Sequence, residues 1–349
     1  MLQNKEPKYC YNDIMIQPTV LSKVTSRKEC NLPNTLPIFT APMDNVVGSE
    51  SFDKYEKNGI IPILPRPLSI DVRIKNTKGW SAYGLREFEE YFCDPQKKLL
   101  NRYALIDVAN GHMSCIYDLV RKAKQIWDND LVIMVGNIAN PETYKIAEEA
   151  GVDYIRVGIG GGRGCITSTC CSIHRPMASL VSDIVQIKKS ILGKCKIVAD
   201  GGIRGYGDVI KALSLGADYV MIGSVFAQML EAEGEIQGEG YECSLKKDEI
   251  IYQGQGIFKY RGYPVKLFKT FYGMASGKGQ ESIGGCHTKT SEGCVKILEV
   301  KYTMKSWIEN MRSYLKSAMS YVGVTELKQF ATNAECIIIS QATQDSINK

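Results

Sequence analysis

The sequence predicts an α/β fold, a (β/α)8 TIM barrel, from three observations. Eight short runs of apolar residues alternate with segments whose apolar residues recur at helical spacing, which is typical of a parallel sheet covered by helices. Polar residues and glycines gather directly after the fourth to eighth runs, where barrels build their ligand sites. The 349 residues can hold a barrel of about 250 residues with extensions. The alternative is a doubly wound sheet, which usually has fewer strands and a glycine fingerprint after its first strand.

The eight predicted strands are short and mostly continuous in their apolar character. They cover residues 36–40, 59–64, 80–83, 103–107, 131–135, 154–157, 196–199 and 219–222. The clearest helical patterns cover residues 49–57, 115–127, 207–215, 224–233 and 305–321. A further helix follows Pro141 and ends at Ala150, because proline suits the first helical turn.

We expect a single domain over residues 1–349, with no inserted regulatory domain. The barrel core is predicted at about 36–233, and a C-terminal hairpin, flap and helix at about 234–330. Residues 234–270 are polar and rich in Gly, Tyr and Lys, which favours a β-hairpin excursion. Residues 277–295 are rich in Gly, Ser and Thr. They predict either a flap that closes over a site or a plain surface loop.

The composition narrows the partners and the compartment. The net charge is +5, and basic residues are interspersed with acidic ones, so nucleic acid is not an expected partner. No stretch approaches the roughly 18 apolar residues of a membrane span, and the N-terminus lacks a signal-peptide core. We therefore expect a cytoplasmic protein with no membrane partner.

The 12 cysteines are scattered along the chain, and without an export signal they are expected to be reduced thiols. Cys165, Cys170, Cys171 and His174 lie close together in the sequence, which raises a zinc site as an alternative. Structural zinc sites usually show two spaced pairs of ligands. This spacing therefore favours free thiols.

Five polar side chains stand just beyond the ends of predicted strands: Asp107, Asn137, Cys165, Asp200 and Ser224. Each alone is readily explained as a cap or turn residue. Together they indicate a shared site, because the carboxyl ends of barrel strands meet at one face. The interval between the strands at 154–157 and 196–199 is unusually long, and long loops in compact domains are often functional.

The residue types at these strand ends suggest a nucleoside monophosphate as the ligand. The Asp200 carboxylate can accept hydrogen bonds from two ribose hydroxyls. Gly201, Gly202, Gly223 and Ser224 offer backbone N–H groups near helix starts for a phosphate. In the loop after residue 157, five glycines precede Cys165. Cys165 is a candidate nucleophile, and its thiol needs activation by backbone N–H groups or by a nearby positive charge. Arg163 could supply that charge.

Several of these segments resemble motifs of the IMP dehydrogenase/GMP reductase family. The segments are Thr40-Ala-Pro-Met-Asp44, Ile106-Asp-Val-Ala-Asn-Gly-His112, Val157-Gly-Ile-Gly-Gly-Gly-Arg-Gly-Cys-Ile-Thr167, Ala199-Asp-Gly-Gly-Ile-Arg204, Met221-Ile-Gly-Ser224 and Phe271-Tyr-Gly-Met-Ala-Ser276. Their order is that of the family, over about residues 10–330. The reductase branch is the more similar one, because of Asp107-Val-Ala-Asn-Gly, the segment from Ser320 to Lys328, and the absence of a regulatory insert.

The resemblance implies roles for individual residues. Cys165 would be the nucleophile, and Thr167 and Glu292 would handle protons. The substrate would be held by Asp200, Gly201, Gly202, Gly223, Ser224, Gly273, Met274, Ala275, Lys289 and Gly293. The cofactor would meet Ser26, Arg27, Arg66, Asp107, Val108, Ala109, Ile159, Gly160, Ser317 and Ser320, of which Ser317 and Ser320 would come from a neighbouring subunit. The backbone carbonyls of Gly160, Gly162 and Cys165 would match a potassium site.

The resemblance further implies a purine nucleotide oxidoreductase that works through a covalent cysteine thioimidate. The expected reaction reduces GMP with NADPH to IMP and ammonia, in a homotetramer. Two alternatives stay open: IMP dehydrogenase, which oxidises IMP with NAD, and a catalytically weak relative that only binds nucleotide. Gly161, Gly164, Lys289 and the segment from Ser168 to Arg175 depart from the family pattern.

Overall fold

The computed structural model describes residues 6–284 and 290–347. Its centre is a parallel sheet in the order β2-β9-β8-β7-β6-β5-β4-β3. These strands are β2 (Ile38–Thr40), β3 (Ile63–Leu64), β4 (Trp80–Tyr83), β5 (Tyr103–Asp107), β6 (Val132–Ile138), β7 (Tyr154–Val157), β8 (Lys196–Asp200) and β9 (Tyr219–Ile222). A parallel bridge between Phe39 of β2 and Ile61, two residues before β3, brings together the two ends of this order. The sheet therefore closes, and the predicted (β/α)8 barrel is confirmed.

Alternation along the strands separates two hydrophobic cores. One side of each strand points into the barrel, where buried side chains pack together: Phe39, Ile63, Trp80, Ala82, Leu105, Met134, Val198 and Met221. The rings of Phe39 and Trp80 meet edge to face, with centroids 5.7 Å apart, a favourable geometry for aromatic pairs. The other side of each strand packs against the surrounding helices. Burial on both faces explains why the strands are continuously apolar in sequence.

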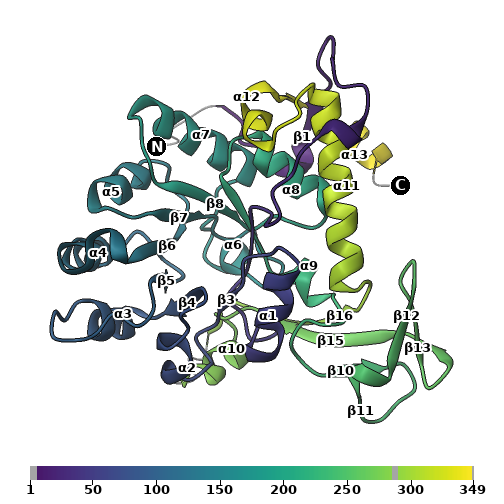
Figure 1. Cartoon of the computed structure of the whole chain (residues 1–349), viewed down its shortest axis with the longest axis horizontal. Coiled ribbons are helices and arrows are strands. Elements are labelled where there is room, and N and C mark those ends of the chain that lie inside the picture. Colours follow the sequence, from purple (N-terminus) through teal and green to yellow (C-terminus); the bar gives the residue numbers. More distant parts are fainter. Residues whose placement is uncertain (1–5, 285–289, 348–349) are drawn as a thin grey trace.

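Helices follow the strands and cover the outside of the barrel (Figure 1). They are α1 (Ser49–Lys57), α2 (Ile70–Ile74), α3 (Leu85–Phe92), α4 (Ser114–Trp127), α5 (Thr143–Ala150), α7 (Met177–Ser190), α8 (Tyr206–Ser214) and α9 (Ser224–Ala227). The short α6 (Thr167–Cys170) belongs instead to the loop between β7 and α7. The helices predicted at 49–57, 115–127, 207–215 and before Ala150 correspond to α1, α4, α8 and α5.

The helix predicted at 224–233 is shorter than expected, since α9 ends at Ala227. The reason is the buried Lys269, whose Nζ donates to the carbonyls of Met229, Leu230 and Ala232 at 2.7, 3.1 and 2.6 Å. These carbonyls therefore face an ammonium group instead of continuing a helix.

The chain beyond the barrel forms two antiparallel sheets rather than the single hairpin expected at 234–270. One sheet has the order β11-β10-β15-β16 and the other β12-β13-β14. The strands are β10 (Ile236–Gly238), β11 (Ser244–Leu245), β12 (Ile250–Gly254), β13 (Ile257–Tyr260), β14 (Tyr263–Val265), β15 (Leu267–Tyr272) and β16 (Val295–Glu299). Both project from one side of the barrel (Figure 1).

The remaining elements lie outside the barrel, and two of them pair the two ends of the chain. The predicted helix at 305–321 is α11 (Met304–Val322), and the segment 277–295 contains the short α10 (Gly277–Ser282). Near the N-terminus, β1 (Ile14–Gln17) pairs antiparallel with β17 (Glu335–Ile338). The smaller elements are η1 (Tyr11–Asp13), η2 (Arg27–Glu29), η3 (Asp128–Asp130), η4 (Lys247–Glu249), η5 (Leu327–Gln329), α12 (Phe330–Asn333) and α13 (Gln341–Ile347). In the described part of the chain, no helix has the length and apolar character of a membrane span.

Candidate active site

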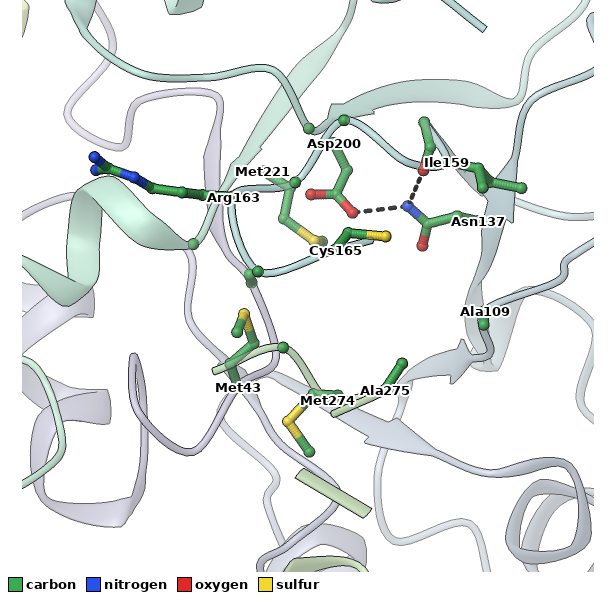
Figure 2. A pocket seen from close by; sticks show the side chains of 18 of the residues that line it. Met43, Ala109, Asn137, Ile159, Arg163, Cys165, Asp200, Met221, Met274 and Ala275 are labelled. Atoms are coloured by element: carbon green, nitrogen blue, oxygen red, sulfur yellow. Dashed lines mark hydrogen bonds between the residues drawn. The ribbon is translucent and has the colours of Figure 1, made fainter. Parts of the chain in front are cut away.

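A cavity of about 550 Å³ opens at the carboxyl ends of the barrel strands. All five strand-end residues singled out from the sequence line it: Asp107, Asn137, Cys165, Asp200 and Ser224. Figure 2 shows Asp200 and Asn137 facing each other above Cys165, with Met274 and Ala275 on the opposite side. Closure of the barrel therefore brings together side chains that are far apart in sequence.

The glycine loop before Cys165 packs closely against neighbouring backbone, which leaves no room for a side chain at two of its glycines. Gly158 has φ of +131°, and a Cβ there would lie 1.9 Å from the carbonyl oxygen of Asp200. A Cβ on Gly164 would lie 2.9 Å from the backbone nitrogen of Gly273. Larger residues at these positions would push the loop away from β8 or from the segment after β15.

Cys165, Thr167 and Glu292 form a continuous hydrogen-bonded chain. The Cys165 thiol donates to Thr167 Oγ1 at 3.2 Å, and the Thr167 hydroxyl donates to Glu292 Oε2 at 2.8 Å. Backbone contacts hold the two segments together, because Ile166 N–H donates to the Glu292 carbonyl at 2.9 Å. Glu292 belongs to the segment 273–294, which contains most of the flap predicted at 277–295 and is called the flap below. The flap thus delivers a carboxylate to the cysteine loop across a long sequence separation.

Asp200 is fixed by two donors. Asn137 Nδ2 and Arg156 Nε both donate to its Oδ2, each at 2.8 Å. Arg156 also reaches Asp107, with Nη1 2.6 Å from Oδ1. Burial alone lowers the pKa of Arg156, but the carboxylates of Asp200 and Asp107 together raise it above its usual value.

Arg156 was not assigned a role by the sequence reasoning. Its side chain crosses β6 at Gly136, where a Cβ would lie 2.4 Å from the Arg156 Cβ. The signal in the sequence was an arginine inside an otherwise apolar strand of a parallel sheet, where a charge is rarely buried without partners.

The other end of the cavity is lined by residues predicted to meet the cofactor: Arg66, Asp107, Val108, Ala109, Ile159 and Gly160. Arg66 Nη1 donates to the Asp107 carbonyl at 3.4 Å. Its Nε is buried and has no hydrogen-bond partner in the described structure. A buried N–H without a partner is unfavourable, and because this nitrogen exposes no surface, it offers no donor to a ligand in the cavity.

Most of the predicted site residues line this cavity, and a few do not. In addition to those named above, the lining includes Gly162, Thr167, Gly201, Gly202, Gly223, Gly273, Met274, Ala275 and Glu292. Gly293 is buried in the flap and pairs with Cys165 through the backbone. Lys289 falls outside the described residues. Within the described ranges, no three His, Cys, Asp or Glu side chains are grouped to hold a metal ion, which leaves the zinc alternative without a site there.

Four predicted cofactor residues lie away from the cavity. Arg27 begins the η2 turn and Ser26 caps it. This turn packs against α11, the helix that carries Ser317 and Ser320. A hydrogen bond from Ser22 Oγ to the Ser320 carbonyl, 2.9 Å long, attaches the same region to α11. These four residues therefore gather on one outer face of the chain, and none of them lines the cavity of their own chain.

Comparisons with known proteins agree with the architecture of this site. The model of the IMP dehydrogenase / GMP reductase domain matches residues 102–348. A GMP reductase of Staphylococcus epidermidis is 31% identical over 345 residues, which cover 92% of this chain and 94% of the relative. GMP reductases of Streptococcus agalactiae and Lactobacillus delbrueckii subsp. bulgaricus are 29% and 28% identical, covering 93% and 91% of this chain and of their own lengths.

Proposed function

Because the chain belongs to the IMP dehydrogenase / GMP reductase family, and is thus a purine nucleotide oxidoreductase, we propose that it is a GMP reductase. In this proposal GMP and NADPH are converted to IMP, ammonia and NADP⁺. The observation that carries the proposal is the hydrogen-bonded chain from Cys165 through Thr167 to Glu292. The match to relatives named GMP reductase over nearly the whole chain supports this direction of the reaction over IMP oxidation.

The proposed mechanism begins with transfer of the Cys165 proton through Thr167 to Glu292. The resulting thiolate attacks C2 of GMP and forms a carbon–sulfur bond. The same carboxylic acid then returns a proton to the 2-amino group, because ammonia leaves readily only when it is protonated. Departure of ammonia gives a thioimidate on Cys165. Hydride delivery to C2 and release of the thiolate yield IMP.

The nucleotide would be held by the β8 and β9 ends of the cavity. Asp200 Oδ2 is occupied by Asn137 and Arg156, so Oδ1 is the oxygen proposed to accept from the ribose. Gly201 and Gly202, with φ of +113° and +74°, shape the turn proposed to approach the phosphate together with Gly223 and Ser224. Gly273, Met274 and Ala275 would lie along the base, with Gly293 of the flap beside it.

A nicotinamide cofactor is proposed for the other end of the cavity, which Arg66 and Ala109 line. NADPH, or NADH as the alternative, would supply the hydride when bound. Arg66, Asp107, Val108, Ala109, Ile159 and Gly160 are the residues proposed to hold it. Small side chains such as Ala109 leave room for a flat ring between Asn137 and the flap (Figure 2).

The backbone carbonyls of Gly160, Gly162 and Cys165 are the ones proposed to hold a potassium ion, and two of them already accept hydrogen bonds. Ser168 Oγ donates to the Gly160 carbonyl and Cys165 N–H to that of Gly162, both at 3.1 Å. Three cationic side chains line a cavity beside the same carbonyls: Arg163, Arg204 and Lys296. Their positive charges weaken the attraction for a cation, but each carbonyl oxygen keeps a second lone pair that could bind potassium. No step of the mechanism is derived through potassium.

We extend the proposal to a cytoplasmic homotetramer. Ser26, Arg27, Ser317 and Ser320 lie together on an outer face, and in an oligomer this face would complete the cofactor site of a neighbouring copy. Cyclic or dihedral association of identical chains is the common form of oligomer.

The proposal is tested by two incubations that follow the absorbance of the reduced cofactor. One contains GMP with NADPH, and the other contains IMP with NAD. Loss of absorbance in the first alone is the expected result. A gain of absorbance in the second alone would favour IMP dehydrogenase. Unchanged absorbance in both mixtures, despite nucleotide binding, would favour a protein that only binds nucleotide.

A further inference from the structure

The flap leaves the sheet and rejoins it at one pair of residues. Tyr272, the last residue of β15, pairs with Val295, the first residue of β16. Residues 273–294 between them form the flap that carries Glu292. Contacts that fix Tyr272 therefore also fix the base of the flap.

Asp44 and Asn45 hold Tyr272 from the segment that follows β2. The Tyr272 hydroxyl donates to Asp44 Oδ2 at 2.7 Å, and Asn45 Nδ2 donates to the Tyr272 carbonyl at 2.8 Å. Figure 2 shows Met43, next to Asp44, beside Met274, two residues after Tyr272, at the edge of the cavity. The proposed mechanism does not account for these two hydrogen bonds.

The surroundings of Tyr272 make its bond to Asp44 important. Tyr272 and Asn45 are buried. Burial and the Asp44 carboxylate raise the pKa of Tyr272, so its hydroxyl stays protonated and donates. The other carboxylate oxygen of Asp44, Oδ1, is buried and has no hydrogen-bond partner in the described structure. Because a buried acceptor without a partner is costly, the placement of this carboxylate depends on the Tyr272 hydroxyl.

The base of the flap packs on the residue that precedes the proposed nucleophile. Gly273 follows Tyr272 and lies against Gly164, where a Cβ would be 2.9 Å from the Gly273 backbone nitrogen. At the other end of the flap, the Cys294 N–H donates to the Gly164 carbonyl at 2.9 Å. The base of the flap therefore sets where the cysteine loop lies relative to the carboxylate of Glu292.

The short helix α10 of the flap also rests on Tyr272. Lys278 Nζ of this helix lies 5.1 Å from the centroid of the Tyr272 ring, within the range of a cation–π interaction. Next to Lys278, a Cβ on Gly279 would lie 2.6 Å from the Gly273 carbonyl oxygen. Tyr272 and the residue after it thus support the flap from its base to its helix.

We infer that Asp44 and Asn45 are positioning residues, which act through Tyr272 to hold the flap against the cysteine loop. None of the three lines the active-site cavity, so they act on the reaction through the backbone that they hold. The inference rests on the proposed function where it concerns the relay from Cys165 to Glu292. The contacts that hold the flap are independent of it.

The first measurement is hydrogen exchange, which needs no turnover. The N–H groups of Ile166 and Cys294 donate across the contact between the flap and the cysteine loop, and their exchange reports how often these bonds open. In Tyr272→Phe, which removes only the hydroxyl, both amides should exchange about tenfold faster. Tyr144→Phe is the matched control, because the buried Tyr144 hydroxyl donates at 2.9 Å to the carbonyl of Cys195, which precedes β8 at the opposite end of the barrel.

The second measurement separates positioning from general destabilisation. Tyr272→Phe and Asp44→Ala should each lower kcat for GMP reduction about tenfold and change the KM for GMP by less than about threefold. The double variant should lose no more than either single variant, because both substitutions remove the same hydrogen bond. Asp44→Asn should keep most of the wild-type rate, because its amide oxygen can still accept from the hydroxyl.

Four results would overturn the inference. They are unchanged amide exchange in Tyr272→Phe, equally accelerated exchange in Tyr144→Phe, a loss in Asp44→Asn as large as that in Asp44→Ala, and additive losses in the double variant. If the wild-type protein does not reduce GMP, the proposed function fails. The exchange rates then still decide whether Asp44 and Tyr272 hold the flap.

Discussion

Cys165 is one of 12 cysteines, and its surroundings set it apart from the others. Its thiol donates to Thr167, whereas Cys170 and Cys171 are exposed on or just after the short α6 helix. A thiol that hands its proton to a relay is poised to become a nucleophile. In the described structure, neither of these two thiols is hydrogen-bonded to a hydroxyl that reaches the Glu292 carboxylate.

A first prediction follows for the cysteines. Cys165→Ala should still bind GMP but lose turnover by about four orders of magnitude, as expected for removal of a covalent nucleophile. Cys170→Ala and Cys171→Ala should keep near-normal rates. Steady-state rates and calorimetric GMP binding check the three variants. If Cys170→Ala or Cys171→Ala abolishes turnover while Cys165→Ala does not, the nucleophile has been assigned to the wrong thiol.

Glu292 offers a prediction that separates proton handling from closure of the flap. Glu292→Gln keeps an oxygen for the Thr167 hydroxyl but cannot exchange a proton usefully. Loss of ammonia needs an acid, whereas hydride transfer between the cofactor and the thioimidate depends much less on an acid. The variant should therefore block GMP turnover, yet give a burst of reduced cofactor when supplied with IMP and NADP⁺ at alkaline pH, where hydroxide can take the thiol proton in place of Glu292.

The measurement is rapid-mixing absorbance of the reduced cofactor together with an ammonia assay. Glu299→Gln is a matched control, because Glu299 is exposed on β16, close to the flap. It should leave both half-reactions intact. A burst reduced in the same proportion as GMP turnover would show that Glu292 acts by closing the flap.

At the scale of elements, Arg156 on β7 links β5 and β8 through Asp107 and Asp200. The aligned positions of Asp107, Gly136 and Arg156 across β5, β6 and β7 give the guanidinium a straight path over Gly136. The site therefore depends on strand register as much as on residue type. A larger residue at position 136 would block that path.

We predict that Arg156→Met destabilises the protein by about 3–5 kcal/mol, because it leaves two partly buried carboxylates without their partner. Urea unfolding gives the free energy, and Arg102→Met is the control. Arg102 pairs with Asp130 at the surface, where such a pair contributes about 1 kcal/mol or less. Equal losses for the two variants would contradict a special role for the buried network. Arg156→Lys should recover only part of the loss, because lysine lacks the planar fork of donors.

At the scale of the whole molecule, the barrel could be predicted because each strand is buried on both faces and therefore apolar throughout. The strand-end residues could be predicted for the same reason, since barrel geometry brings them together. The partners of Asp200 could not, because the path of Arg156 over Gly136 depends on register. The early end of α9 was missed because the cause, Lys269, arrives from a strand 40 residues later in the chain.

The placement of Ser26 and Arg27 could not be predicted either, because nothing local shows which face of the assembled chain they occupy. Both lie with Ser317 and Ser320 on the η2–α11 face, outside their own cavity. If the proposed oligomer is correct, this face serves a neighbouring copy. That arrangement is open to a complementation experiment between two defective variants.

Arg27→Ala and Cys165→Ala should each be nearly inactive as homo-oligomers when assayed at low NADPH concentration. After unfolding, equal mixing and refolding, about half of the cavities keep Cys165, and about half of those face a neighbour that keeps Arg27. Activity should therefore return to about a quarter of the wild-type value. Mixing Arg27→Ala with the double variant Cys165→Ala/Arg27→Ala should restore none, since no subunit then carries Arg27. If the first mixture also stays inactive, Arg27 acts within its own chain or not at all, and the η2–α11 face does not complete a neighbour's cofactor site.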